Sequence, residues 1–411
     1  MTEPVPPQSP LATIRELVGS PGRTHPYPRY ELLREHGAVV AVRPGLMAVV
    51  GYAECDAALR DARLRVQDGL SYDAIYPAWR EHPALCGYID SMLYRNPPDH
   101  ARMRRLVNSG FTPRRANGLR PAVEQLTDRL LDRLAEAGGA GAPVDFIAEF
   151  ASRLPIAVVA ALLGVPEEDH GWFRAVATDL TIALEGITNV SRLDRADAAM
   201  DDLGAYFGDL IEARRREPAD DLATALVAVH DTDGTRLSGD ELVGNMMLLL
   251  TAGFETTSFL LGHALLLAFA HPEHAERLRT DADFAPGFVE EVLRFEPPVQ
   301  ATSRWAESDL ELLGTVVPAQ TKLVLLLAAA NRDPRRYPQP DRFDPDRTDV
   351  QPLSFGAGAH YCLGAPLSRL EARIALPRLL RRFPRLAPVG EPTPRDRWLG
   401  RGLARFPVSV S

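Results

Sequence analysis

The sequence predicts a mainly α-helical protein with a small β part, built as one large domain around a long central helix. Apolar residues recur with helical periodicity from about residue 101 to residue 134. A second, mostly apolar stretch of helical length covers residues 246–270. Short runs of β-forming residues flank turn residues in two further places. Because 411 residues can bury a large core, we expect a single domain over residues 1–411, with a flexible tail at about residues 1–10.

The first predicted β element is a short hairpin. Residues 39–42 and 46–50 are apolar and β-branched, and they flank the turn sequence Arg43-Pro44-Gly45. The helical pattern that follows is interrupted near Thr112-Pro113, because the residue before a proline disfavours helix. We therefore expect a hairpin and then a helical region with a break.

The central helix is predicted to run from Asp240 to about Ala270. Ser238 and Glu241 form the S-x-x-E pattern of a capping box at its start. At about 1.5 Å per residue it is roughly 45 Å long, enough to cross a whole domain. Its length and apolar character also suit a membrane span. However, Glu255 and His263 are expensive in lipid, so we predict a buried core helix.

The later elements follow from the same signals. Strands are expected at residues 310–313 and 323–327, around the turn residues Gly314 and Pro318. A last helix begins at Ala365, where a proline in the first turn is tolerated. Pro377 lies further along this helix and is expected to kink it.

Composition and charge exclude several classes of protein. A hydrophobic content of 45% and a charged content of 25% are typical of a soluble globular protein. The net charge of −9 argues against nucleic-acid binding, which needs a basic face. Three cysteines are too few and too scattered for a disulfide framework, and the N-terminus lacks the sections of a signal peptide. We expect a cytoplasmic protein that does not bind membranes.

The most informative segment covers residues 354–364, S-F-G-A-G-A-H-Y-C-L-G. Its cysteine, Cys362, lies in a glycine-rich loop just ahead of the last predicted helix. A thiol at a helix N-terminus is near free backbone amides and the positive end of the helix dipole, so its thiolate is favoured. Such a thiolate suits a single iron ligand. Three other roles stay open from the residues alone: an inert buried thiol, a zinc ligand with His360, or a Cys/His nucleophile.

This segment resembles the haem-binding loop of the cytochrome P450 family, F-G-x-G-x-H-x-C-x-G, at each fixed position from Phe355 to Gly364. The resemblance extends from about residue 25 to the C-terminus. It implies the cytochrome P450 fold, with the long helix crossing over the haem. It also implies haem b as cofactor, with the thiolate of Cys362 as the axial iron ligand.

The sequence A-G-F-E-T-T at residues 252–257 lies mid-way along the long helix. Its glycine permits close packing, and threonine hydroxyls that bond to the previous turn bend helices. The resemblance implies more: Glu255 and Thr256 match the acid-alcohol pair that delivers two protons to bound dioxygen. Ala252 and Gly253 then lie beside the haem.

Haem carries two propionates, which need cations or hydrogen-bond donors. The sequence N-P-P-D-H-A-R-M-R at residues 96–104 resembles the family's D-P-P-x-H-x-x-x-R, with Asn96 in place of the usual acid. The resemblance assigns four anchoring residues: His100, Arg104, Arg304 and His360. Taken singly, each would be interpreted as a solvated surface residue.

Glu291 and Arg294 form an E-x-x-R sequence. On the residues alone this is a solvated helical pair worth under about 0.5 kcal/mol. The resemblance implies a buried pair instead, completed by Arg342 in the sequence P-D-R-F. The expected role of the three residues is structural, since they hold the region behind the cysteine loop.

The resemblance implies a monooxygenase that uses O2 to hydroxylate, epoxidise or oxidatively couple a medium-sized hydrophobic metabolite, in bacterial natural-product biosynthesis. The chain contains neither an iron–sulfur cysteine cluster nor a dinucleotide fingerprint. A separate ferredoxin and an NAD(P)H-dependent ferredoxin reductase are therefore expected, with the enzyme as a monomer. Two alternatives remain: a peroxide-driven peroxygenase or other haem-thiolate enzyme, and a non-catalytic recruitment module on the same fold. Aromatic residues in the stretch 69–94 slightly favour a planar substrate, although they also fill ordinary cores.

Overall fold

The computed structural model describes residues 9–19, 23–108, 118–185, 192–232 and 237–410. The predicted class, mainly α with a small β part, is confirmed. The chain forms two compact units, each built from three separate segments. The first unit contains residues 1–66, 262–362 and 391–406, and the second contains residues 67–261, 363–390 and 407–411. The single domain over residues 1–411 stays a prediction.

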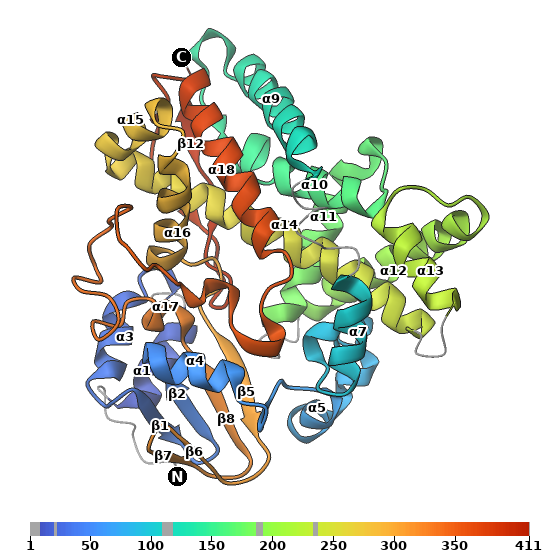
Figure 1. The fold of residues 1–411 in the computed structure, drawn as a ribbon, viewed down its shortest axis with the longest axis vertical. Coiled ribbons are helices and arrows are strands. Elements are labelled where there is room, and N and C mark those ends of the chain that lie inside the picture. The colour runs from blue at the N-terminus through green and yellow to red at the C-terminus, as the bar shows by residue number, and fades with distance from the viewer. Residues whose placement is uncertain (1–8, 20–22, 109–117, 186–191, 233–236, 411) are drawn as a thin grey trace. The chain divides into compact units, whose positions relative to one another are not determined.

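The first unit is built on a mixed five-stranded sheet in the order β1-β2-β8-β5-β3. Its strands are β1 (Val39–Arg43), β2 (Leu46–Val49), β8 (Thr321–Leu325), β5 (Thr302–Ala306) and β3 (Leu64–Arg65). Strand β2 pairs with β8 in parallel, and the other pairings are antiparallel. Figure 1 shows blue and orange strands side by side, since the sheet joins segments far apart in the sequence.

The predicted β elements of the first unit are present. The hairpin is formed by β1 and β2, and the strand predicted at residues 323–327 is β8, which begins and ends two residues earlier. The run at 310–313 forms a second hairpin of β6 (Leu310–Leu312) and β7 (Thr315–Val317). Alternate residues of β8 are buried, as expected where successive side chains point to opposite faces of a sheet. A short pair, β10 (Thr393–Pro394) and β11 (Leu403–Arg405), completes the strands described in this unit.

This unit also contains α-helices. They are α1 (Pro10–Val18), α3 (Tyr27–Arg34), α4 (Tyr52–Arg60), α15 (Pro272–Thr280), α16 (Phe284–Phe295) and α17 (Leu327–Ala330). Residues 1–8 of the predicted flexible tail lie outside the described residues. The rest of that tail is not irregular: Ser9 caps α1 through its side chain, 3.2 Å from the amide of Ala12, and Pro10 is the first helical residue.

The second unit is helical, with a small three-stranded sheet. Its helices are α5 (Gly69–Ile75), α6 (Pro83–Asp90), α7 (Asp99–Asn108), α9 (Arg120–Ala137), α10 (Arg153–Leu163), α11 (His170–Leu180), α12 (Leu193–Arg216), α13 (Leu222–Thr232) and α18 (Ala365–Arg382), together with most of α14 (Gly239–Ala270). The sheet has the order β4-β12-β9, formed by Val144–Asp145, Pro407–Ser409 and Ala387–Pro388. Apolar faces of α6, α10, α11, α12 and α14 pack into one core. The helical pattern at 101–134 corresponds to α7 and α9, and its predicted break at 112–113 lies outside the described residues.

The predicted central helix is α14. Its capping box is formed as expected: the Ser238 amide donates to Oε2 of Glu241 over 2.9 Å, and the Glu241 amide donates to Oγ of Ser238 over 3.1 Å. The helix is long and apolar enough to cross a membrane, but 72% of its most apolar window is buried within the protein. This burial is typical of a core helix in a globular protein.

Helix α18 follows the cysteine loop in the sequence and lies along α9 (Figure 1). Arg378 of α18 forms an ion pair with Asp128 of α9, 2.7 Å away. Pro377 lies within α18, and the helix continues past it to Arg382. Proline has no backbone N–H, so one backbone hydrogen bond of this helix is missing. Ion pairs from Arg378 and Arg382 to α9 support the part of the helix that follows Pro377.

Candidate functional site

The cysteine loop of the first unit is a tight, non-repetitive turn. Gly356 and Gly358 have φ values of +67° and +68°, a left-handed region that side chains rarely adopt. A Cβ atom at Gly358 would lie 2.6 Å from the carbonyl oxygen of Leu59, so only glycine fits there. The Cys362 amide donates to the Phe355 carbonyl over 2.9 Å and closes the loop. The loop thereby holds Cys362 half-buried and outside any disulfide.

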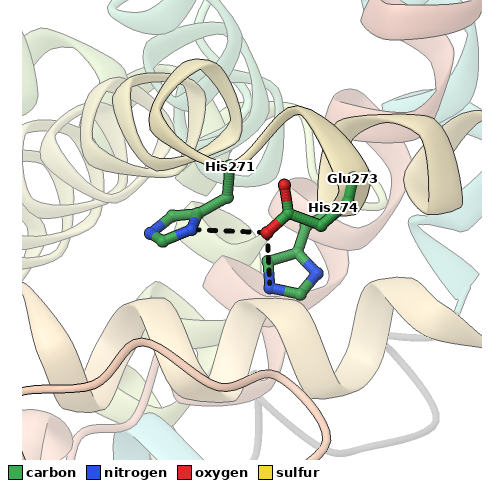
Figure 2. A group of neighbouring side chains, drawn as sticks. All are labelled: His271, Glu273 and His274. Carbon is green, nitrogen blue, oxygen red and sulfur yellow. Dashed lines mark ion pairs between the residues drawn. The ribbon is translucent and has the colours of Figure 1, made fainter.

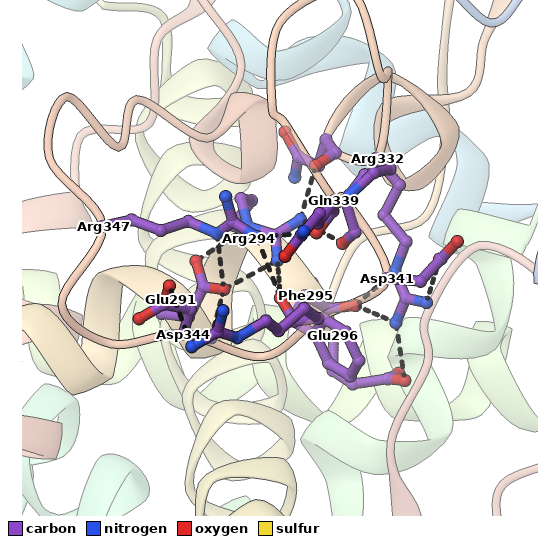
Figure 3. Close-up of polar contacts among 12 residues, drawn as sticks. Glu291, Arg294, Phe295, Glu296, Arg332, Gln339, Asp341, Asp344 and Arg347 are labelled. Carbon is purple, nitrogen blue, oxygen red and sulfur yellow. Dashed lines mark hydrogen bonds and ion pairs between the residues drawn. The ribbon is translucent and has the colours of Figure 1, made fainter.

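Behind this loop, Glu291 and Arg294 of α16 form a fully buried ion pair (Figure 3). Two guanidinium nitrogens of Arg294 each lie 2.7 Å from a carboxylate oxygen of Glu291, which is the strong bidentate arrangement. Arg294 also donates to the carbonyls of Asn331 and Pro340, at 3.1 and 2.8 Å. Since both charges are buried and fully bonded, this is not the solvated surface pair that the residues alone would suggest.

The prediction that Arg342 completes this group is wrong. The Arg342 side chain is 66% exposed and approaches Asp344 only at 3.9 Å. Arg347 is the third member: its Nε lies 3.2 Å from Oε1 of Glu291, and its side chain is only 11% exposed (Figure 3). Arg342 contributes its backbone carbonyl, which accepts hydrogen bonds from Arg294 and Arg347, both over 3.1 Å. The sequence contains Pro-Asp-Arg twice, at 340–342 and 345–347, and only the folded loop decides which arginine points inward.

Asn331, which the sequence did not single out, connects this group to the cysteine loop. Its backbone carbonyl accepts from Arg294, while its side-chain oxygen accepts from the Leu353 amide over 2.7 Å. Its side-chain nitrogen donates to Oγ of Ser354 over 2.9 Å. Asn331 is fully buried, so each of these bonds replaces one to water. The chain of contacts therefore fixes the start of the cysteine loop relative to α16.

Arg304 on β5 is a buried cation that has no carboxylate partner among the described residues. Its side chain is 5% exposed, and its guanidinium donates to the carbonyl of Ser303 over 2.8 Å. Burial lowers the pKa of Arg304 to about 10. Among the residues that the structure describes, no acidic side chain is paired with it. A buried guanidinium is costly unless an anion accompanies it, so this donor fits a group that carries carboxylates, as haem does.

In the second unit, the acid-alcohol pair lies on α14. Glu255 is buried, and Thr256 donates its hydroxyl to the Ala252 carbonyl over 2.8 Å, the bond to the previous turn that the residues predict. Thr257 points elsewhere and donates to Oγ of Ser368 on α18 over 3.1 Å. Ala252 is exposed in the middle of a mostly buried helix.

The remaining predicted anchors of this unit belong to α7. His100 is buried, and its amide donates to the Asn96 carbonyl over 3.0 Å. Asn96, which departs from the family's acid, is also buried and donates to Oδ2 of Asp68 over 3.1 Å. An acid at position 96 would repel Asp68, so the amide suits its neighbour. Arg104 lies one turn after His100 on the same helix.

The predicted site residues are thus divided between the two units. The first unit holds Phe355, His360, Cys362 and Arg304, and the second holds His100, Arg104, Ala252, Gly253, Glu255, Thr256 and Gly364. Gly364 is the cap of α18, and its carbonyl accepts from the Ser368 amide. How the two groups combine stays a prediction.

The aromatic stretch at residues 69–94 contributes to the core. Tyr72, Trp79 and Tyr88 are buried. The ring of Tyr72 lies 6.2 Å from those of Trp79 and Tyr94, and the ring of Tyr88 lies 6.5 Å from that of Tyr94. Because these rings pack on one another, the stretch provides no argument for a planar substrate.

A buried carboxyl on α18 leads to a prediction about pH. Glu371 is 2% exposed, its Oε2 has no hydrogen-bond partner among the described residues, and burial raises its pKa well above 4.5. The protonated form is therefore favoured in the folded protein. The stability that this raised pKa contributes to the folded protein is fully present below pH 4.5, the ordinary pKa of the group. It is lost as the pH rises from there towards the folded pKa, at about 1.4 kcal/mol of unfolding free energy per pH unit. We expect Glu371→Gln to reduce this loss, measured as the free energy of unfolding in urea at pH 5 and pH 8. An unchanged difference between the two pH values would contradict the prediction.

Comparisons with known proteins agree with these features. Residues 189–409 match the family model described as Cytochrome P450. The chain is 36% identical to 6-deoxyerythronolide B hydroxylase of Saccharopolyspora erythraea, over 97% of this chain and 100% of that protein. It is 40% identical to the cytochrome P450 monooxygenase PikC of Streptomyces venezuelae, over 88% of this chain and 85% of the relative. The ligand-free crystal structure of Mycobacterium smegmatis CYP164A2 superimposes with a TM-score of 0.86 at 37% identity, covering 97% of this chain and 100% of that one.

Proposed function

The chain belongs to the cytochrome P450 family and is a monooxygenase, and from this premise we propose that Cys362 binds the iron of haem b through its thiolate. We further infer that the substrate is a medium-sized hydrophobic metabolite of a bacterial natural-product pathway, which is hydroxylated, epoxidised or oxidatively coupled. Relatives named as a 6-deoxyerythronolide B hydroxylase and a mycinamicin IV hydroxylase/epoxidase support this substrate class.

The observation that carries the proposal is the cysteine loop. Two left-handed glycines and the hydrogen bond from the Cys362 amide to the Phe355 carbonyl hold the thiol half-buried and outside any disulfide, so that a ligand can reach it. When bound, haem with a thiolate ligand supplies the activation of O2. The role of the protein at this position is to fix the place of the Cys362 sulfur. The buried contacts of Asn331 with Leu353 and Ser354 serve this, since they fix the loop from behind.

Arg304, His360, His100 and Arg104 are proposed to bind the haem propionates. Arg304 offers the strongest support, because it is a buried cation that lacks a carboxylate partner among the described residues. A propionate beside it would supply the missing anion through a charge-assisted hydrogen bond. Ala252 and Gly253 are proposed to lie against the haem face, since Ala252 is exposed with a small side chain and Gly253 has none.

Glu255 and Thr256 are proposed to deliver protons. The hydroxyl of Thr256 donates to the Ala252 carbonyl, so its two lone pairs remain available to accept a hydrogen bond. Glu255 is buried one residue away and is the nearest acid along the helix. A hydroxyl that accepts a proton on one side and releases it on the other can relay protons away from this carboxyl.

Replacing Thr256 with alanine tests this role. We expect Thr256→Ala to bind haem normally but to form less product per NAD(P)H oxidised, with the electrons diverted to hydrogen peroxide. The loss in product is expected to be about tenfold or more, because positioned proton transfer typically contributes 10²–10⁴-fold. Thr257→Ala is the matched control, since that hydroxyl bonds to Ser368. Equal coupling in wild type and Thr256→Ala would show that protons arrive by another route.

The enzyme is proposed to be a cytoplasmic monomer that receives electrons from a separate ferredoxin and an NAD(P)H-dependent ferredoxin reductase. The proposal that it acts away from membranes is supported by the burial of α14, the helix long and apolar enough to span a bilayer. Reconstitution with ferredoxin, reductase and NAD(P)H should sustain turnover. Turnover with peroxide alone would favour a peroxygenase instead.

The spectrum of the reduced protein under carbon monoxide tests the haem ligand directly. We expect the absorption typical of thiolate-ligated haem, and a spectrum typical of histidine-ligated haem would overturn the proposal. A protein that stays colourless after haem-supplemented expression would favour a non-catalytic recruitment module. For a haem-containing protein, screening metabolites for a change in the haem absorption spectrum on binding would identify the substrate class.

A further inference from the structure

A cluster of three potential metal ligands lies in the first unit, where α14 ends and α15 begins (Figure 2). His271 precedes α15, and Glu273 and His274 belong to its first turn. The three side chains point toward one another, and their ligand atoms all lie within 4.8 Å of one another. The cluster is separate from every residue assigned to the haem.

The distances between the three ligand atoms suit coordination of one shared ion better than direct hydrogen bonds between the side chains. Oε1 of Glu273 lies 3.6 Å from Nδ1 of His271 and 3.9 Å from Nε2 of His274. Both distances are longer than a good hydrogen bond, which is about 2.7–3.2 Å. Ligands bound tetrahedrally at about 2.0–2.1 Å from a zinc ion are about 3.3–3.4 Å apart. Small side-chain rotations would therefore bring the three atoms to coordination distance.

Neighbouring aromatic rings hold both imidazoles in place. The His271 ring stacks on Phe343 with a centroid distance of 5.1 Å and an interplanar angle of 28°. The His274 ring lies 5.7 Å from Phe284 and 5.9 Å from Phe343. Because packing already restricts these rings, an ion that binds them loses less side-chain entropy than it would at mobile surface histidines.

The possible tautomers of His274 also suit coordination. Nδ1 of His274 is buried and has no hydrogen-bond partner among the described residues, so moving the ring proton there to free Nε2 breaks no hydrogen bond. The nearby Arg277 is paired with Asp346 at 2.6 and 2.9 Å, which offsets its charge.

We propose that His271, Glu273 and His274 bind one divalent transition-metal ion of the zinc class, with water completing the coordination. Two imidazole nitrogens and one carboxylate oxygen suit Zn²⁺ and Cu²⁺, whereas Mg²⁺ and Ca²⁺ prefer all-oxygen sites. The ion would join the end of α14 to the first turn of α15. This proposal does not depend on the haem or on the substrate.

The test is titration of the tag-free, haem-loaded protein with Zn²⁺ by isothermal titration calorimetry. We expect one ion per chain, bound at least about tenfold more weakly by His271→Asn and by Glu273→Gln, since even the outer partners of metal ligands are typically worth 10–100-fold in affinity. Asparagine is a favourable residue at a helix N-cap, so the first variant should leave α15 intact. Glu276→Gln is the matched control: Glu276 is also exposed on α15 but pairs with Arg279.

Electron paramagnetic resonance of the Cu²⁺-loaded protein gives a second measurement. We expect nitrogen hyperfine coupling from two imidazoles in the wild type and from one in His271→Asn. The proposal is overturned if the wild type binds no ion at millimolar Zn²⁺. It is also overturned if affinity is unchanged in both His271→Asn and Glu273→Gln, because the ion then binds elsewhere.

Discussion

Cys362→Ser is expected to abolish the thiolate spectrum of the reduced protein under carbon monoxide and to remove nearly all monooxygenase activity. A serine hydroxyl at this position is not ionised at neutral pH and donates far less electron density to iron than a thiolate does. We expect turnover to fall by about 100-fold or more, equivalent to about 2.7 kcal/mol in the activation barrier. Spectra and product formation should be measured on protein of matched haem content.

Cys86→Ser provides the control for this prediction. Cys86 lies on α6 of the second unit and is half-buried. Its sulfur is 3.7 Å from the carbonyl oxygen of Arg80. The third thiol, Cys55, is fully buried, so replacing it would disturb the core. We expect Cys86→Ser to keep the wild-type spectrum. A thiolate spectrum that survives in Cys362→Ser, or disappears in Cys86→Ser, would assign the iron ligand to a different residue.

Arg294→Met is expected to lower the free energy of unfolding by about 3–5 kcal/mol, because it leaves the buried charge of Glu291 without its main partner. It also removes the donors to the carbonyls of Asn331 and Pro340. Since Asn331 holds the cysteine loop, haem should be lost from this variant more readily than from the wild type. Urea unfolding and the rate of haem transfer to an acceptor protein measure the two effects.

Urea unfolding also distinguishes the two arginines of the repeated Pro-Asp-Arg sequence, Arg342 and Arg347. Arg347→Met should destabilise the protein by about 1–3 kcal/mol, since Glu291 keeps Arg294 but loses a second charged donor. Arg342→Met should change stability by no more than about 0.5 kcal/mol, because that side chain is exposed. Equal losses from the two substitutions would mean that Arg342 does belong to the buried group.

Much of the fold follows from local signals. The capping box of Ser238 and Glu241 marks the start of α14, and both of its hydrogen bonds are formed. The first hairpin follows from its turn residues in the same way. The cysteine loop was also recognisable, because its glycines are required by the backbone of the loop itself, as the positive φ values of Gly356 and Gly358 show. Interactions within a few residues of one another can be predicted when their residue types and spacing are known.

The aromatic stretch and Asn331 show where such reasoning ends. Tyr72, Tyr88 and Trp79 were equally compatible with a binding surface and with a core, and only their packing against one another decides the question. Asn331 carries no motif, yet its backbone and side chain join α16 to the cysteine loop. Its importance depends on partners that are brought together by folding.

The sequence by itself determined the family, the position of the cysteine and the course of the central helix, because each depends on residue types at fixed short spacings. Only the tertiary structure decided that Arg347 and not Arg342 completes the buried group with Glu291. It also decided that His271, Glu273 and His274 converge. For Arg347 the physical reason lies in the irregular segment that carries it. In such a segment the direction of a side chain depends on the path of the backbone and on whether a buried charge nearby needs a partner. Neither can be read from the residue type at that position.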